Sequence, residues 1–117
     1  MDQEIIGLAD VLQRLQDDKA LLLELIQIFL DDAPHRLDDA QRLIGQGDAD
    51  ELANTAHALK GASSNVGAVK LWQTFKEMEQ AAKDKDLAGA KRLLQKASLE
   101  FVELQEYFPQ LKSRLSA

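Results

Sequence analysis

The sequence contains no cysteine and only two histidines, His35 and His57. The absence of cysteine excludes disulfides, thiolate zinc sites and cysteine nucleophiles, and two histidines are too few for a histidine-rich metal site. Valine, isoleucine and threonine together number only 11 of the 117 residues, and they never alternate with polar residues over the length of a strand. Helix-favouring leucine, alanine, glutamate, lysine and glutamine are abundant. The scarcity of β-branched residues and the abundance of helix-favouring ones predict an all-α fold.

The sequence also lacks a long apolar run, a basic leader and an excess of positive charge. Its apolar stretches are only a few residues long, whereas about 20 are needed to span a bilayer, and residues 1–4 are acidic. Its 20 acidic and 14 basic residues give a net charge of −6, the wrong sign for binding nucleic acid phosphates. We therefore expect a cytoplasmic monomer that forms one domain over residues 1–117 and contacts neither a membrane nor nucleic acid.

Apolar residues that recur every three or four positions predict five helices. The expected helices cover residues 4–15, 18–45, 49–66, the stretch from after Gly67 to about 84, and 87–115. Pro34 should bend the second helix without ending it, and Pro109 should bend the last helix or end it early. Short loops make the four longer helices antiparallel, which predicts an up-down four-helix bundle with the additional short N-terminal helix as a lid on one end.

Two aspartates mark where helices are expected to begin. Asp48 follows a glycine suited to a left-handed helix end, and Glu51 lies three residues after it, as in a capping box. Asp86 is the predicted N-cap of the last helix.

A helical wheel at 100° per residue divides the third helix into a core face and a polar face. The predicted core face holds Leu52, Thr55, Leu59, Ala62 and Val66. His57 lies nearly opposite. The exposed face around His57 is predicted to hold small or short polar residues and one cation, namely Asp50, Ala53, Asn54, Lys60, Gly61 and Ser64.

Gly61 bears on the interpretation of this histidine. A lone histidine on a polar helix face is usually an ordinary surface residue, but a glycine inside a helix costs about 1 kcal/mol relative to alanine. Nothing in a bundle requires a missing side chain one turn after His57. A flat surface beside an exposed imidazole would let another protein approach it closely.

The stretch Ala56-His57-Ala58-Leu59-Lys60-Gly61-Ala62-Ser63-Ser64-Asn65-Val66-Gly67-Ala68 closely resembles the motif of histidine-containing phosphotransfer (HPt) domains. In that motif a His-x-x-Lys-Gly core is followed six residues later by a second glycine. The resemblance extends over residues 29–34, the Gly47-Asp48 turn and residues 71–79, so it covers roughly residues 20–84. It implies a histidine phosphocarrier of a two-component phosphorelay that is not an enzyme and has no ATP site or autokinase activity.

The resemblance implies a role for several residues. His57 would accept a phosphoryl group from the phosphoaspartate of a response-regulator receiver domain and pass it to another receiver, because an exposed neutral imidazole is a nucleophile. Lys60 would offset the charge of the phosphoryl oxygens, and Asn54, Gly61 and Ser64 would face the partner. No metal or cofactor is expected on this chain, and Mg²⁺ is expected on the receiver. A hybrid sensor histidine kinase is a further expected partner, and the chain could be its cytoplasmic C-terminal part.

Glu79 is a further candidate from geometry. His57 lies 10 residues before Gly67 and Glu79 lies 12 residues after it, so an antiparallel helix pair places them nearly level. The resemblance implies that an acid or amide at this position accepts a hydrogen bond from Nδ1 of His57 and leaves Nε2 as the nucleophile. An ordinary surface glutamate is the alternative.

A histidine kinase dimerisation module and a helical adaptor are the two alternative classes of protein. A histidine kinase dimerisation module would have a glutamate directly after the histidine and a proline one turn later, and His57-Ala58 offers neither. A non-catalytic helical adaptor explains the bundle but not Lys60 and Gly61 around an exposed histidine, and it is kept as the alternative. The acidic pairs 31–32 and 38–39 are interpreted as solvated faces rather than a metal site.

Overall fold

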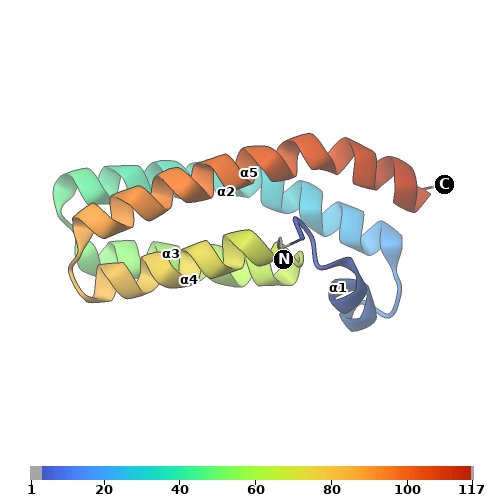
Figure 1. The fold of residues 1–117 in the computed structure, drawn as a ribbon, viewed down its shortest axis with the longest axis horizontal. Coiled ribbons are helices and arrows are strands. Elements are labelled where there is room, and N and C mark those ends of the chain that lie inside the picture. Colours follow the sequence, from blue (N-terminus) through green and yellow to red (C-terminus); the bar gives the residue numbers. More distant parts are fainter. Residues whose placement is uncertain (1–3, 117) are drawn as a thin grey trace.

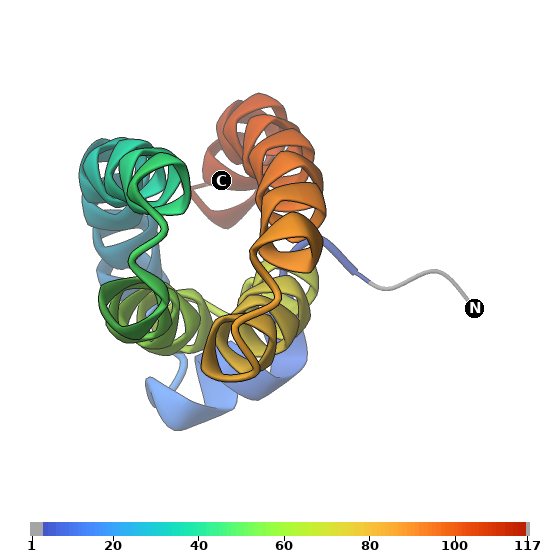
Figure 2. The same cartoon turned by 90° about the vertical axis from the view of Figure 1, so that its left-hand side faces the viewer.

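The computed structural model describes residues 4–116, and all the regular structure in this range is helical (Figure 1). The helices are α1 (Leu8–Arg14), α2 (Lys19–Gln46), α3 (Ala49–Asn65), α4 (Val69–Lys83) and α5 (Leu87–Ser116). The four longer helices alternate in direction and surround a common core, as Figure 2 shows along the bundle axis. The predicted all-α, antiparallel four-helix bundle with a short N-terminal helix is therefore confirmed.

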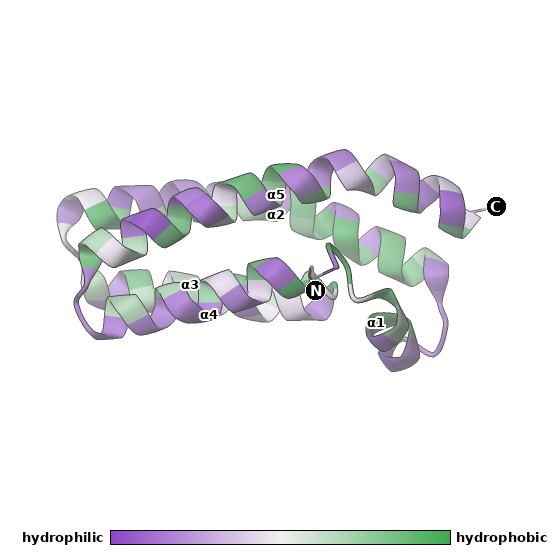
Figure 3. Cartoon of the chain, viewed as in Figure 1, coloured by the Kyte–Doolittle hydropathy of each residue, from purple (hydrophilic) through white to green (hydrophobic). Residues whose placement is uncertain are grey.

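The core consists of one apolar stripe from each helix, and Figure 3 shows hydrophobic and hydrophilic residues alternating along the ribbons. The α5 stripe is the longest. It buries Ala90, Leu94, Ala97, Phe101, Leu104, Phe108 and Leu111, as its alternating steps of three and four predict. Phe101 meets Phe29 of α2 edge to face, with the ring centroids 5.9 Å apart. Such contacts fix the rotation of each helix about its axis, and thereby fix which residues face solvent.

The helices begin and end largely where the turn signals predict. The Asp48 carboxylate accepts a hydrogen bond from the Glu51 backbone N–H at 3.2 Å, and Asp86 accepts one from Gly89 at 2.9 Å. α2 continues through Pro34, as predicted. α5 also continues through Pro109 to Ser116, so an early end at that proline was wrong. A proline inside a helix removes only one backbone hydrogen bond, and the buried Phe108 and Leu111 hold α5 on either side of it.

α1 is shorter than predicted because it begins at Leu8 rather than near residue 4. The Gly7 backbone N–H donates to the carbonyl of Gly67 at 2.8 Å, so the preceding segment is attached to the α3–α4 turn instead of forming a helical turn. Gly67 itself has a φ of 71°, and a Cβ there would lie 2.9 Å from the Cβ of Val11. Only glycine satisfies both the positive φ and the close contact with α1.

The buried face of α3 differs from the predicted one. Ala56 and Ser63 are buried, whereas Thr55 and Ala62 are only partly buried. The Ser63 hydroxyl donates to the Leu59 carbonyl at 2.8 Å, which satisfies the hydroxyl inside the core. The true core direction is therefore rotated by about 40° on the helical wheel, toward α4. His57 is turned toward α4 by the same angle, instead of pointing straight out of the bundle.

Candidate functional site

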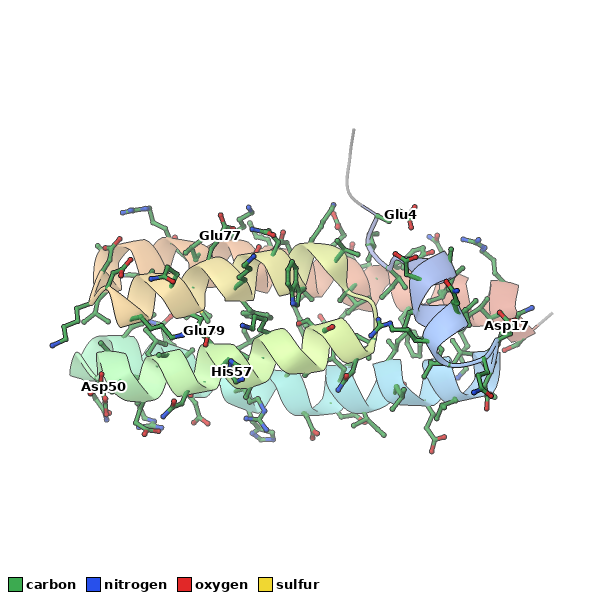
Figure 4. The ribbon with its side chains drawn as sticks, turned by 90° about the horizontal axis from the view of Figure 1, so that it is seen from below. Glu4, Asp17, Asp50, His57, Glu77 and Glu79 are labelled. Atoms are coloured by element: carbon green, nitrogen blue, oxygen red, sulfur yellow. The ribbon has the colours of Figure 1, made fainter. Side chains whose placement is uncertain are left out.

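His57 lies near the middle of α3, where its side chain is 68% exposed. Figure 4 shows it next to Glu79, at the junction between α3 and α4. The imidazole is therefore open to a partner on one side and in contact with the protein on the other. This position follows from the α3 core stripe, because the burial of Ala56 and Leu59 leaves His57, directly after Ala56, at the edge of the α4 contact.

Glu79 lies at the centre of a polar cluster that includes His57. Its side chain is only 10% exposed, and its carboxylate has three partners. Oε2 lies 3.0 Å from Nδ1 of His57 and 3.4 Å from Nζ of Lys83, while Oε1 lies 2.7 Å from Nζ of Lys60. We call these four residues the Glu79 cluster. Because α3 supplies two members and α4 the other two, the cluster depends on how these two helices pack.

The cluster keeps the Glu79 carboxyl ionised. Burial opposes its ionisation, but the hydrogen bonds from Lys60, His57 and Lys83 outweigh burial, and the pKa of Glu79 is lowered. An ionised carboxylate can only accept hydrogen bonds. The Nδ1 atom of a neutral His57 must therefore carry the proton of this contact, which leaves the lone pair on Nε2. The geometry selects the tautomer in which Nε2 is unprotonated.

The three residues predicted to face the partner, Asn54, Gly61 and Ser64, lie on α3 outside the Glu79 cluster. Asn54 is exposed and its amide donates to Glu51 at 3.3 Å, while Ser64 is half-buried and its carbonyl accepts from Arg14 at 2.8 Å. Gly61 is exposed, and a Cβ added there would meet nothing within 4 Å. A larger side chain at position 61 would not clash with this protein, so packing does not require the glycine. This agrees with the prediction of a flat surface beside His57.

Lys60 departs from its predicted setting. The sequence predicts Lys60 on the exposed face, but its side chain is only 25% exposed because the ammonium group turns in to meet the buried carboxylate of Glu79. The sequence pattern shows that Lys60 is one turn from His57, but it does not show which of the two neighbouring helices offers it a counterion.

Two features near His57 were missed by sequence reasoning. The first is Lys83, which follows Glu79 by four residues, a spacing that itself signals a pair on one helix face. The second is a groove of about 170 Å³ between α2 and α3, on the other side of His57 from α4. Its lining includes Ala58 and Ala62 of α3 and Ile28 of α2, which is 50% exposed. Ile28 is a large apolar residue outside the α2 core stripe, and this position could have indicated the groove from the sequence.

Across residues 4–116, no group of three or more histidine, cysteine, aspartate or glutamate residues is arranged to hold a metal ion. None of the helices described in that range combines the length and apolarity needed to cross a bilayer.

Comparison with known proteins agrees with the geometry. A family model described as the Hpt domain matches residues 24–115. The histidine-containing phosphotransfer protein 2 of Oryza sativa subsp. japonica is 30% identical over 114 residues, which cover 91% of this chain and 76% of the relative. Among solved structures, histidine-containing phosphotransfer protein B from Pseudomonas aeruginosa PAO1 superposes with a TM-score of 0.76 at 34% identity, covering 92% of this chain and 90% of that one. The maize protein ZmHP2 gives 0.76 at 26% identity, covering 97% and 86%.

The bundle and its exposed histidine thus define the class of phosphorelay histidine phosphocarriers, as the sequence predicted. Within that class, the chain belongs to the Hpt domain family.

Proposed function

We propose that Nε2 of His57 carries the phosphoryl group, which it takes from the phosphoaspartate of a receiver domain and gives to a second receiver. The observation that carries this proposal is the contact between Nδ1 of the exposed His57 and the buried, ionised carboxylate of Glu79. This contact turns the free lone pair of the ring toward solvent, where a partner can reach it. His35, the other histidine, is exposed on α2 without a hydrogen-bond partner of this kind among the described contacts.

In the proposed step, the Nε2 lone pair attacks the phosphorus atom in line with the bond to the aspartate oxygen. The N–P bond forms as the P–O bond breaks, and the aspartate leaves as a carboxylate. Lys60 and Lys83 lie beside the ring and would offset the charge that gathers on the phosphoryl oxygens. Transfer to the second receiver is the reverse of this step on another aspartate.

The proposed partner surface is centred on His57 and extends toward α2. Gly61 leaves room for the receiver to approach, and the groove beside Ile28 offers an apolar contact. Asn54 lies about one turn before His57 on α3 and Ser64 about two turns after it. The receiver would bring its own Mg²⁺ to the phosphoaspartate. The proposed carrier has no ATP site and acts as a cytoplasmic monomer, with receivers and a hybrid sensor histidine kinase as partners.

The test is to incubate the chain with receiver domains that carry a labelled phosphoaspartate, without ATP or kinase. The proposal predicts rapid appearance of label on this chain in a bond that is stable to alkali and labile to acid, as phosphohistidine is. A helical adaptor would bind the receiver and leave the label on it. That second outcome, with binding demonstrated, would replace the carrier function by the adaptor function.

A further inference from the structure

Glu79 is a carboxylate with three donors around it, and this arrangement has a consequence for the loaded carrier. Resting on the proposed function, we infer that Glu79 keeps the proton on Nδ1 after His57 has been phosphorylated. The carried phosphoryl group then stays on a cationic ring, which is the more reactive donor form. Glu79 would thus be a positioning residue that sets how quickly the loaded carrier discharges.

The ring of His57 carries the same proton before and after the proposed transfer. Nε2 attacks with its lone pair while Nδ1 already holds a proton, so the product ring carries a proton and a phosphoryl group and is a phosphoimidazolium. Without a partner for Nδ1, such a ring would lose this proton to water near neutral pH. In this protein the proton points at the Oε2 atom of Glu79, 3.0 Å from Nδ1 and shielded from solvent. A negative charge at this distance favours the protonated form of the ring.

The charges of the cluster support the same conclusion. Before transfer, the lysines at 60 and 83 outnumber the single carboxylate, so the cluster carries one net positive charge around a neutral ring. The transferred phosphoryl group brings one negative charge and makes the cluster neutral, provided that the ring keeps its proton. Loss of the proton would leave a net negative charge in a partly buried place. The phosphoryl oxygens would also attract the two ammonium groups and so free the carboxylate for Nδ1.

Among the described residues, Glu79 is the charged group in hydrogen-bond contact with the ring, and other charged groups line the hollows on either side of it. On α4, Lys76 and Glu77 line the hollow next to Lys60 and carry opposite charges. On α2, Asp32 and Arg36 line the groove on the far side of α3, and they are also of opposite sign. Glu79 is therefore the group that we expect to control the ring proton.

The experiment uses the protein labelled by phosphoramidate, a small donor that does not depend on receiver docking. The ¹⁵N shift of Nδ1 and the ³¹P shift of the phosphoryl group are followed from about pH 5 to 9, together with the rate at which phosphate is lost. The variant is Glu79→Gln, which keeps the size and one acceptor oxygen but removes the charge. Glu77→Gln is the matched control, since it removes an equal charge from the exposed side of the same helix.

We expect the ring of the wild type to lose its Nδ1 proton at least about one pH unit higher than the ring of Glu79→Gln. At pH 8 the wild type should therefore lose phosphate about tenfold faster, and Glu77→Gln should behave like the wild type. Equal titrations in the wild type and Glu79→Gln would overturn the inference, as would an equal shift in both variants. So would a ring that phosphoramidate does not label, because the inference assumes an exposed Nε2.

A measurement on the wild type alone covers the case in which Glu79→Gln does not fold. The titration of the phosphorylated ring in the folded protein is compared with that in the same protein unfolded in urea. A higher midpoint in the folded state supports the inference, and equal midpoints contradict it. If phosphoramidate labels His57 and these results hold, but no receiver transfers phosphate to the chain, the carrier function fails while the inference about Glu79 stands.

Discussion

The carboxylate of Glu79 lies 3.0 Å from Nδ1 of His57, although 22 residues separate them in the sequence. The contact joins two antiparallel helices at one level and distinguishes the two nitrogens of the ring, because Nδ1 holds the proton and Nε2 keeps a free lone pair. The same carboxylate lies 2.7 Å from Nζ of Lys60, so one buried charge contacts both the imidazole of His57 and a cation.

Glu79 should make the stability of the protein depend on pH in a defined direction. Its pKa is lowered in the folded state, so its contribution is complete above the unfolded-state pKa and is lost as the pH falls through the lower folded-state pKa. We expect Glu79→Gln to lower the free energy of unfolding by about 1–3 kcal/mol at pH 7. The difference from the wild type should shrink below about pH 4. Urea denaturation of both proteins at pH 7 and pH 3 measures it, and a difference independent of pH would be evidence against the ion cluster.

Lys60 is expected to matter for folding as well as for transfer, because it is half-buried against Glu79. Lys60→Ala should slow transfer from a phosphorylated receiver and lower the free energy of unfolding by about 1–2 kcal/mol. Lys76→Ala, which removes an exposed lysine from the neighbouring helix, is the control for net charge and should leave the transfer rate nearly unchanged. Should Lys60→Ala transfer phosphate at the normal rate, the lysine would be a structural counterion of Glu79 and nothing more.

Gly61 and Gly45 form a natural pair for testing the docking surface. Both are exposed helical glycines, and a Cβ at either position would meet nothing within 4 Å. Gly61→Gln and Gly45→Gln should both fold, with up to about 1 kcal/mol gained from helix propensity. Only Gly61→Gln should slow transfer from a receiver, on the order of a hundredfold, because its side chain keeps the phosphoaspartate away from the ring. Labelling by phosphoramidate serves as the internal reference and should be unchanged in both. If a receiver transfers phosphate to Gly61→Gln and Gly45→Gln at equal rates, Gly61 does not serve receiver docking.

Ile28 tests whether the groove between α2 and α3 belongs to the partner surface. Ile28 and Leu99 are 50% and 74% exposed, and Leu99 lies on α5 outside the groove. Ile28→Asn should weaken receiver binding about tenfold or more, as expected for an apolar contact at the centre of an interface, and Leu99→Asn should not. Titration calorimetry with a receiver domain measures both affinities. A loss of affinity in Leu99→Asn alone would move the docking surface to α5.

The sequence predicts the helices well because their apolar spacing reports burial directly, as the α5 stripe from Ala90 to Leu111 shows. It predicts His57 and Glu79 as neighbours because counting residues from a turn gives their level in an antiparallel pair. It does not predict the inward turn of Lys60, the burial of Ser63 or the groove beside Ile28. These depend on how closely two helices approach and how each is rotated, and a single helical wheel contains neither quantity.

The role of His57 as the only phosphoryl acceptor is tested most directly by comparing two glutamine variants. His57→Gln and His35→Gln each remove one of the two histidines, and both positions are exposed, so both variants should fold with thermal midpoints close to the wild type. Each is incubated with a receiver domain carrying labelled phosphoaspartate, and acid-labile, alkali-stable label on the chain is measured over time. The account predicts wild-type labelling of His35→Gln and none of a folded His57→Gln. Label on His57→Gln, or its loss in His35→Gln, would contradict it.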